Sequence, residues 1–463
     1  MQKLFDEVAS LDARCYEEFG LSEDILMEHA ADGMAQYIRK NFSHHSKIIV
    51  ACGGSNNGAD CIALARLLHG DYEVSVFYVK EAKSQMALLQ KNRAERIGVK
   101  ECFELEDADV LVDAVFGTGF DGEFSDELKP VMQKLSSINA FKIACDIPSG
   151  LKPNGECAPF TFVADVTLTM GALKKSMFLD EAKDFVGKIE VLDLGISRSL
   201  YETSTSWHLL DLEDMQLPYR REKNSHKGSF GHLALACGNK SGASIMSALS
   251  ALRFGVGLVT LVGYENQSVP ETIMYSHELP ANTTALALGM GLGDEFSAVE
   301  LDAFLDNWLP LVADADIFHM PILTEILKRK NLVLTPHAKE FAALLKQTDI
   351  ANVSVDVLQK NRFKYVEMFS LRFPHVTLLL KGANVIIAKD NEYFINPHGT
   401  ASLAKGGSGD VLSGLIGALL AQGYEPLEAA KTASLAHTKL ALNYTGADFS
   451  LTPHHLIDGI GKL

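Results

Sequence analysis

Short apolar runs without polar alternation recur along the first half of the chain, and each is followed by a stretch long enough to form a helix. The runs are KIIVAC (47–52), EVSVFYV (73–79), DVLVDAVF (109–116), FKIAC (141–145), DVTLTM (165–170) and KIEVLDL (188–194). Such runs are typical of strands buried on both faces of a sheet, and helix-length connections are what parallel strands require. The first half is therefore predicted to be a doubly wound, Rossmann-like α/β domain.

A second series of apolar runs begins near residue 231. It comprises GHLALAC (231–237), GLVTLVG (257–263), ALALGMG (285–291), LPLVAD (309–314), NLVLTP (331–336) and VTLLLKG (376–382), followed by helical stretches at 409–423 and 426–444. Between the two series, residues 197–228 are polar and end in the charged stretch YRREKNSHK, as a linker and an entry loop would. We predict two α/β domains, residues 1–205 and 206–463, and the second does not repeat the first.

The composition restricts the classes of function. A chain of 463 residues, 47% of them hydrophobic, is too long for one ordinary core. A formal net charge of −17 argues against a protein that follows nucleic-acid phosphates. The seven cysteines form no CxxC pair, so reduced thiols are expected rather than zinc ligands or disulfides. Because the N-terminal segment is acidic and the apolar runs are too short to span a bilayer, we expect a cytoplasmic protein without a membrane partner.

The glycine-rich segment GGSNNGAD (53–60) follows the first strand, and we predict that a helix starts near Cys61. Backbone N–H groups of such a turn face the carboxyl edge of a parallel sheet, where phosphates bind. A plain βα turn is the simpler alternative. Two further strand ends, DAVFGTGFDGEF (113–124) and DIPSGL (146–151), lie at the same edge, so three loops are expected to converge on one ligand crevice.

Polar side chains in these three loops suggest two kinds of chemistry. Asp146 could move a proton as a carboxylate, although a strand-end aspartate that caps the PSG turn is the alternative. Asn57, Asp113 and Ser149 supply oxygen atoms that could hold a hard monovalent cation. GTGFDG (117–122) fits GxGxxG, but no clearly apolar helix follows it, so a dehydrogenase fingerprint is the less favoured interpretation.

These motifs resemble those of a known family. LSEDILMEHAA (21–31), SNNGAD (55–60), DAVFGTGF (113–120) and DIPSGL (146–151) are similar to segments of the NAD(P)H-hydrate epimerases, and the resemblance covers most of residues 1–200. It implies that potassium binds to Asn57, Asp113 and Ser149, and that Asp146 is the acid–base group in contact with substrate. It also implies that the hydrated dinucleotide is bound by Asn56, Asn57, Gly58, Ala59, Asp60, Gly117, Thr118, Gly119, Phe120, Asp121, Gly122 and Glu123.

The sequence departs from the family pattern at three positions. The family's NNGGDG is NNGADC here, so that Ala59 and Cys61 replace glycines, and His29 stands where the family's LMEN has its asparagine. An added methyl at Ala59 is tolerable where φ is negative and costly otherwise. Reduced epimerase activity is therefore an open hypothesis.

The C-terminal half carries a glycine loop of another kind. No GxxxxGK[ST] sequence occurs in the chain, which excludes a P-loop phosphotransferase. KGGSGDVLSG (405–414) instead runs from glycines into a helix. Backbone N–H groups at Gly406, Gly407 and Gly409 could collect phosphoryl charge while Asp410 accepts a proton. The alternative is a glycine-rich helix N-cap with Asp410 in the first turn.

A second resemblance covers the chain from about Lys223 to the C-terminus. HKGSFGHLALACGNKSGA (226–243), GMGLG (289–293), LTPHAKEF (334–341), LLLKGA (378–383) and GGSGDVLSG (406–414) resemble segments of the ADP/ATP-dependent NAD(P)H-hydrate dehydratases, which belong to the ribokinase-like superfamily. The resemblance implies substrate contacts from Ala243, Gly291, His337 and Asp410, and nucleotide contacts from Lys381, Gly382, Ala383, Gly406, Gly407 and Gly409. Taken alone, His337 is more often a cap or a loop histidine.

Together the two resemblances predict a bifunctional enzyme that repairs hydrated NAD(P)H. The first domain would interconvert the R and S forms. The second would phosphorylate the C6 hydroxyl of the S form, with Asp410 as the base, and phosphate loss would restore NAD(P)H. The implied cofactors are potassium, and magnesium with ADP or ATP. A homo-oligomer with small-molecule partners and no nucleic-acid partner is expected. The alternative is a vitamin or sugar kinase fused to a nucleotide-binding module without activity.

Overall fold

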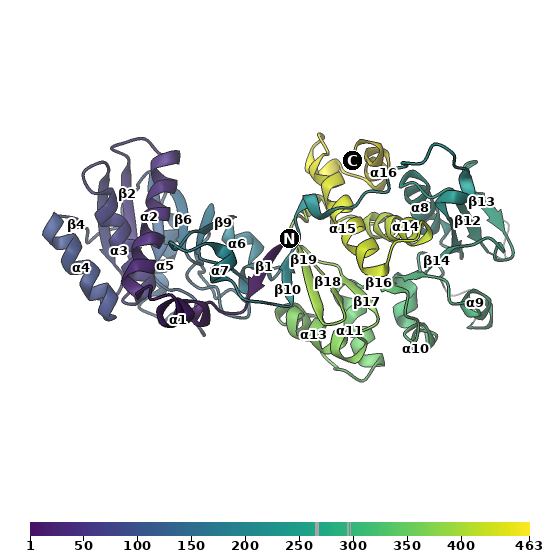
Figure 1. Cartoon of the computed structure of the whole chain (residues 1–463), viewed down its shortest axis with the longest axis horizontal. Coiled ribbons are helices and arrows are strands. Elements are labelled where there is room, and N and C mark those ends of the chain that lie inside the picture. Colours follow the sequence, from purple (N-terminus) through teal and green to yellow (C-terminus); the bar gives the residue numbers. More distant parts are fainter. Residues whose placement is uncertain (264–267, 294–295, 297) are drawn as a thin grey trace. The chain divides into compact units, whose positions relative to one another are not determined.

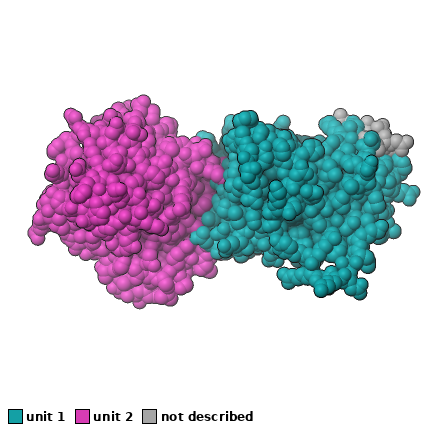
Figure 2. Space-filling view, turned by 90° about the horizontal axis from the view of Figure 1, so that it is seen from above, with its two compact units in different colours: residues 1–2, 206–463 teal, residues 3–205 magenta. Residues whose placement is uncertain are grey.

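The computed structural model describes residues 1–463 apart from 264–267, 294–295 and 297 (Figure 1). The chain separates into two compact units, one of residues 3–205 and one of residues 206–463 together with residues 1–2 (Figure 2). The division between Thr205 and Ser206 lies inside the polar segment 197–228. Each unit has its own hydrophobic core.

The N-terminal unit is built on a parallel sheet. Its strands are β2 (Lys47–Cys52), β3 (Glu73–Tyr78), β4 (Lys100–Glu101), β5 (Val110–Ala114), β6 (Phe141–Cys145), β7 (Val166–Met170) and β9 (Lys188–Leu192). They lie in the order β4-β3-β2-β5-β6-β7-β9, and all neighbouring pairs are parallel. The predicted doubly wound α/β fold is confirmed. The strand order reverses between β2 and β5, and the loops that leave these strands diverge, which opens a crevice at their carboxyl ends.

Helices cover both faces of this sheet (Figure 1). They are α1 (Ala9–Glu18), α2 (Glu23–Asn41), α3 (Asn56–Leu68), α4 (Gln85–Ile97), α5 (Lys129–Ser137), α6 (Lys183–Val186) and α7 (Arg198–Tyr201), and a short strand β1 (Gln2–Phe5) pairs with β8 (Leu173–Lys174). Ile48 and Val50 of β2 enter one core cluster, whereas Ile49 and Ala51 enter another. Because adjacent side chains of a strand point to opposite faces, β2 is buried on both, and its sequence therefore shows no polar alternation.

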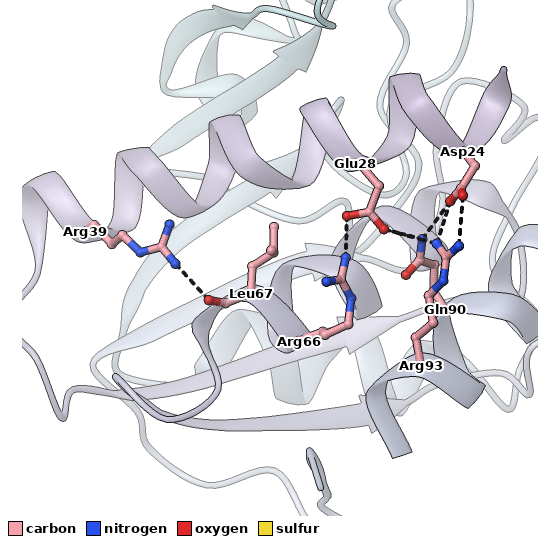
Figure 3. A network of polar contacts seen from close by, with 7 residues as sticks. All are labelled: Asp24, Glu28, Arg39, Arg66, Leu67, Gln90 and Arg93. Carbon is pink, nitrogen blue, oxygen red and sulfur yellow. Dashed lines mark hydrogen bonds and ion pairs between the residues drawn. The ribbon is translucent and has the colours of Figure 1, made fainter. Parts of the chain in front are cut away.

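Charged side chains tie α2 to α3 and α4, as Figure 3 shows. Arg93 of α4 pairs with Asp24 at 2.6 Å and with Glu28 at 3.1 Å, and Glu28 also accepts a hydrogen bond from Arg66 of α3. These side chains are partly exposed, so each ion pair contributes at most about 1 kcal/mol. As a network they fix the position of α2, which forms part of the wall of the site described below.

The C-terminal unit holds a mostly parallel sheet in the order β13-β12-β11-β14-β15-β16-β17-β18-β19-β10. The strands are β10 (Trp207–Leu209), β11 (His232–Ala236), β12 (Leu258–Val262), β13 (Met274–Ser276), β14 (Ala285–Leu288), β15 (Leu311–Ala313), β16 (Leu332–Leu334), β17 (Thr377–Leu380), β18 (Val385–Lys389) and β19 (Glu392–Asn396). Only β17, β18 and β19 pair in antiparallel fashion among these described strands. The sequence analysis missed the β18–β19 hairpin, whose turn residues Asp390 and Asn391 both have positive φ, as type I′ turns require.

The described part of the C-terminal unit contains nine α-helices. They are α8 (Ser241–Arg253), α9 (Ala298–Leu305), α10 (Leu323–Ile326), α11 (Ala338–Gln347), α12 (Val355–Lys360), α13 (Arg362–Arg372), α14 (Ser408–Ala421), α15 (Pro426–Leu442) and α16 (Pro453–Gly459). α14 is buried along almost its whole length, and Gly414 lets it approach α8, because a Cβ there would lie 2.0 Å from the Ser250 hydroxyl. The predicted helices at 409–423 and 426–444 are confirmed. No helix among the described residues has the length and apolar content to cross a membrane.

Candidate active sites

A cavity of about 810 Å³ opens at the carboxyl edge of the N-terminal sheet, where the loops after β2 and β5 diverge. Helices α1 and α2 form another part of its wall, with side chains such as Asp12 and Leu26. The predicted site residues that border the cavity are Asn56, Asn57, Asp60, Gly117, Thr118, Gly119, Phe120 and Asp146. The structure therefore brings the three loops together around a space of the size typical of cofactor sites.

Helix α3 begins at Asn56, so the prediction that it starts near Cys61 was wrong. The side-chain amide of Asn57 donates to the Phe116 carbonyl at 3.0 Å, and this contact between two loops overrides the low helix propensity of the paired asparagines. Glycine is required at position 58 in the first turn of α3, because a Cβ there would lie 2.1 Å from the backbone carbonyl oxygen of Gly53. The N-terminus of α3, with its unpaired backbone N–H groups, therefore stands at the cavity, where a phosphate would be favoured.

The other residues predicted to bind the dinucleotide do not border the cavity. Ala59 is fully buried beside Met27 and Ala87, in the contact between α2, α3 and α4. Asp121, Gly122 and Glu123 are exposed. The structure thus brings only part of each predicted segment to the cavity wall.

The three departures from the epimerase pattern also lie outside this wall. Ala59 is helical, so its methyl meets no φ penalty, and Cys61 is buried in the core of the sheet. The ring of His29 lies against Gly195, where an added Cβ would be 2.4 Å from a ring carbon. None of the three side chains therefore occupies the space in which a ligand would bind.

The predicted cation ligands Asn57, Asp113 and Ser149 meet around the backbone of Phe116. The side-chain amide of Asn57 donates to the Phe116 carbonyl at 3.0 Å. The Ser149 hydroxyl donates to Asp113 at 2.7 Å and accepts from the Phe116 N–H at 2.8 Å. Asp113 is fully buried, and burial raises the pKa of its carboxyl to about 6. A buried carboxylate beside hydroxyl and amide oxygens fits a hard monovalent cation, whose charge would offset the cost of burial.

Asp146 follows β6 in a left-handed conformation, with φ at 69°, which costs a non-glycine residue about 1–3 kcal/mol. Its Oδ1 accepts hydrogen bonds from Lys174 Nζ at 2.5 Å, from Thr169 Oγ1 at 3.2 Å and from the Met170 N–H at 2.9 Å. These donors come from β7 and β8 rather than from the PSG turn. The structure therefore does not favour the alternative in which Asp146 caps that turn.

Lys174 is a site residue that the sequence analysis missed. It is only 1% exposed, and its ammonium also donates to Thr169 Oγ1 at 2.9 Å. A buried lysine needs a compensating carboxylate, and Asp146 provides it. The one signal in the sequence was the unusual position of Lys174 directly after an apolar strand run.

Two further lysines, Lys80 and Lys83, border the same cavity and were also missed. They follow β3, and Lys80 Nζ lies 4.7 Å from the centre of the Phe116 ring. The cavity therefore has ammonium groups in its wall as well as carboxylates. In doubly wound folds the groups that recognise the ribose or its phosphate follow the neighbouring strand, so the run VKEAK (79–83) was the available signal.

In the C-terminal unit, the loop GGSGD leads into α14. Gly407 occupies the N-cap position with φ at 88°, and no described atom lies within 4 Å of the place where a Cβ on Gly406 would be. Asp410 lies in the first turn of the helix. Burial raises the pKa of the Asp410 carboxyl to about 6, and the negative charge of Asp314 is the next largest cause of the rise. A pKa in this range suits a general base near neutral pH.

Lys381 connects this loop with the neighbouring strand ends. Its Nζ pairs with Asp314 at 2.8 Å and lies 3.4 Å from the place where a Cβ on Gly409 would be. Ser413 donates to the other oxygen of Asp314 at 2.7 Å. The structure thus brings Lys381, Gly409 and Asp410 together. Gly382 and Ala383 lie in the exposed turn between β17 and β18.

His337 caps α11, which was the alternative role considered for it. The ring Nδ1 of His337 accepts from the backbone N–H of Glu340 at 3.2 Å, and the backbone N–H of His337 donates to the Glu340 carboxylate at 2.8 Å. Burial raises the pKa of Glu340 to about 7. The His337 side chain stays 52% exposed, and Glu340 lies 3.9 Å from Lys381, so the cap also stands beside the loop that holds Asp410.

Ala243 and Gly291 are neighbours, because a Cβ on Gly291 would lie 3.2 Å from the Ala243 Cβ. Ser244 donates to the Met290 carbonyl at 2.6 Å, and Ser247 donates to the Asp410 carbonyl at 2.8 Å. Helix α8 therefore joins the GMGLG loop to the GGSGD loop. No motif in the sequence predicts these serine contacts.

His437 of α15 is another residue that the sequence analysis missed. Its Nε2 lies 3.1 Å from the Ser408 hydroxyl. Burial lowers the pKa of His437 to about 4, so the ring is neutral and holds the glycine loop by a hydrogen bond. Its place inside a helical apolar stretch carried no signal of this contact.

Two family models match the chain in separate segments. The model described as NAD(P)H-hydrate dehydratase matches residues 233–462, and the model described as YjeF-related protein N-terminus matches residues 23–176. The bifunctional NAD(P)H-hydrate repair enzyme Nnr of Helicobacter pylori is 42% identical over 477 residues, which cover 100% of both chains. The Nnr of Dictyoglomus turgidum is 30% identical over 480 residues, with 93% of this chain and 91% of the relative covered.

Among solved structures, the ADP/ATP-dependent NAD(P)H-hydrate dehydratase from Bacillus subtilis, co-crystallized with ATP/Mg²⁺, is 28% identical. It covers 52% of this chain and 92% of its own, with a TM-score of 0.45. The fold and the two sites define a two-domain α/β enzyme. The chain belongs to the family of bifunctional NAD(P)H-hydrate repair enzymes.

Proposed function

We propose that residues 1–205 interconvert the R and S forms of hydrated NADH or NADPH, and that residues 206–463 dehydrate the S form with ADP or ATP. The observation that carries this proposal is the 42% identity to a bifunctional NAD(P)H-hydrate repair enzyme over the whole chain. A vitamin or sugar kinase with an inactive N-terminal module is not favoured, because the relatives match both halves together.

In the N-terminal cavity, the phosphates of the dinucleotide would bind at the N-terminus of α3, with Lys80 and Lys83 near them. The nicotinamide ring would then lie toward Asp146. Potassium held by Asn57, Asp113 and Ser149 would fix the loop after β5 to the DIPSGL loop. Replacing potassium by tetramethylammonium should therefore slow epimerisation severalfold, and Asp113→Asn should abolish that response. A rate that is indifferent to both changes would contradict the cation site.

The epimerisation inverts C6 of the hydrated ring, which carries a hydroxyl beside the ring nitrogen. The nitrogen lone pair can expel this hydroxyl, and water can return to the opposite face, so each step moves a proton. Asp146 borders the cavity and has Oδ1 engaged by Lys174. Its Oδ2 is then available for proton transfer.

In the C-terminal site, Asp410 would take the proton of the C6 hydroxyl, whose oxygen attacks the terminal phosphoryl group of the nucleotide. Backbone N–H groups at the start of α14, together with Lys381, would stabilise the charge on that group. Loss of phosphate from C6 and of a proton from C5 restores the dihydronicotinamide. The described residues hold no cluster of three or more carboxylate, histidine or cysteine ligands, so magnesium would be bound mainly by nucleotide phosphates and water.

A cytoplasmic location is proposed from the cysteines, which are free thiols in the structure, mostly buried, as is usual in a reducing compartment. The expected homo-oligomer stays a prediction, which light scattering of the purified protein tests.

The direct test of the proposed function supplies the purified protein with hydrated NADH, with and without ADP or ATP. Nucleotide-dependent recovery of the dihydronicotinamide absorbance from the S form, and from the R form in the same protein, is the expected result. A stable phosphorylated product without NADH would instead indicate a kinase.

A further inference from the structure

Three further carboxyl groups, those of Asp12, Glu23 and Asp60, border the same cavity as Asp146. Asp12 belongs to α1, and its Oδ1 accepts a hydrogen bond of 2.8 Å from the hydroxyl of Tyr201 at the end of α7. Tyr201 also borders the cavity, and it is 1% exposed. The chemistry assigned to Asp146 leaves this buried pair without a role.

Burial is the strongest influence on the carboxyl group of Asp12. Burial raises the pKa of Asp12, and the negative charge of Asp146 adds to this rise. The hydrogen bond from Tyr201 and the positive charge of Lys174 lower the pKa and so oppose the rise. Glu7, Cys15 and Tyr16 face Asp12 from its own part of the chain, and Asp60 faces it from α3. Because Oδ1 is the acceptor for Tyr201, Oδ2 is left to carry the proton.

Asp146 is in the opposite situation. The ammonium of Lys174 and two further donors all point at its Oδ1, so this carboxyl group has a fixed counter-charge. The cavity is therefore bordered by one carboxyl group with a fixed ammonium counter-charge and by another whose hydrogen-bond donor is a phenol hydroxyl. Such a divergence between two neighbouring carboxyl groups is the pattern by which enzymes separate a base from an acid.

Inversion at C6 places the departing and the entering oxygen on opposite faces of the ring, so one carboxyl group cannot serve both. Resting on the epimerase function proposed above, we propose that Asp12 is the second proton-transfer residue of the epimerase site and that Tyr201 positions it. Asp12 donates its proton to the C6 hydroxyl, the C6–O bond breaks, and water leaves as the nitrogen lone pair forms the N1=C6 double bond.

Water then adds to the other face of C6. The new C6–O bond forms, the C=N electron pair returns to nitrogen, and Asp146 takes the proton of the water. That proton returns from Asp146 to Asp12 through solvent, so the cycle consumes nothing. In the reverse direction the two residues exchange roles.

The test compares Asp12→Asn with Glu17→Gln, a matched change at an exposed residue of the same helix. Asp12→Asn should slow epimerisation of pure R substrate on the order of a hundredfold to ten-thousandfold, the usual effect of losing an acid or base. Dehydration of pure S substrate by the same preparation should be unchanged, which shows that the C-terminal unit is intact. A urea unfolding transition of the N-terminal unit equal to that of Glu17→Gln shows that the unit carrying Asp12 is folded. An Asp12→Asn variant that epimerises at the rate of Glu17→Gln would overturn the role of Asp12.

The pH profile separates a chemical role from a structural one. The wild-type rate should fall on the alkaline side as Asp12 loses its proton, and Asp12→Asn should lack this fall. Tyr201→Phe should move it to higher pH, because the Tyr201 hydrogen bond lowers the pKa of Asp12. An alkaline fall that persists unchanged in Asp12→Asn would contradict the proposal. A wild-type protein without epimerase activity would overturn the proposed function itself, and this role with it.

Discussion

The two carboxyl groups proposed to be catalytic, those of Asp146 and Asp410, both lie at the carboxyl edge of a sheet, but their surroundings differ. Asp146 has a direct counter-ion, Lys174, which is buried with it. Asp410 has no such partner in the described part of the chain, since the nearby Lys381 pairs with Asp314 instead. Burial is the largest influence on Asp410 and raises its pKa to about 6.

This difference shows two ways to prepare a carboxylate for proton transfer. A fixed counter-charge holds the carboxyl group in position, but makes the site depend on the survival of one ion pair. Desolvation makes the group a stronger base, but its activity then depends on pH in an accessible range. Each way has its own experimental signature.

Removal of the counter-ion should have the largest effect. Lys174→Met leaves the partly buried Asp146 carboxylate unpaired, and breaking such a pair destabilises a protein by about 3–5 kcal/mol. Urea unfolding should show that loss in the N-terminal unit, and epimerisation should nearly vanish. Lys100→Met, an exposed lysine in the same unit, is the control. The double variant with Asp146→Asn should recover part of the stability, and a single variant as stable as the control would contradict the role of the pair.

The pH dependence of dehydration should follow Asp410. The base acts when ionised, and its pKa is raised to about 6, so kcat/KM should be high above that pH and fall tenfold per unit below it. Lys381→Met should move the midpoint upward, because the charge of Lys381 lowers the pKa of Asp410. A midpoint near the ordinary aspartate value of about 4 would mean that desolvation does not tune this site.

The smallest effect concerns the glycine loop of the epimerase half. Ala59→Gly and Cys61→Gly restore the family pattern, yet both side chains are buried outside the cavity wall. The epimerisation rate should not rise, and each variant should lose about 1 kcal/mol or more of stability, because glycine is unfavourable inside a helix. A severalfold faster variant would revive the hypothesis that these residues reduce epimerase activity.

The central strands of both units could be predicted because they are buried on both faces, which leaves a continuous apolar run in the sequence. The short, more exposed strands β4 and β13 have no such run and were not predicted. The start of α3 could not, because the contact from Asn57 to the Phe116 carbonyl joins residues 59 positions apart. The β18–β19 hairpin was missed because the antiparallel pair interrupts an otherwise parallel series.

The glycine and aspartate loops of both sites could be located from strand ends and motifs. Their partners could not, because Lys174 and Tyr201 reach Asp146 and Asp12 across 28 and 189 positions of the chain. Neither pairing has a fixed spacing that a sequence pattern would reveal. The sites were therefore predictable as loops, whereas the groups that tune their carboxylates required the structure.

The most direct test of two separate activities mixes two full-length variants, Asp146→Asn and Asp410→Asn, with pure R substrate and ATP. Each variant alone should restore NADH from the R form no faster than the uncatalysed background, since one lacks epimerisation and the other lacks dehydration. The mixture should restore it, because the S form released by one protein is the substrate of the other. A mixture as inactive as its components, or an Asp410→Asn variant that still dehydrates the S form, would contradict the account.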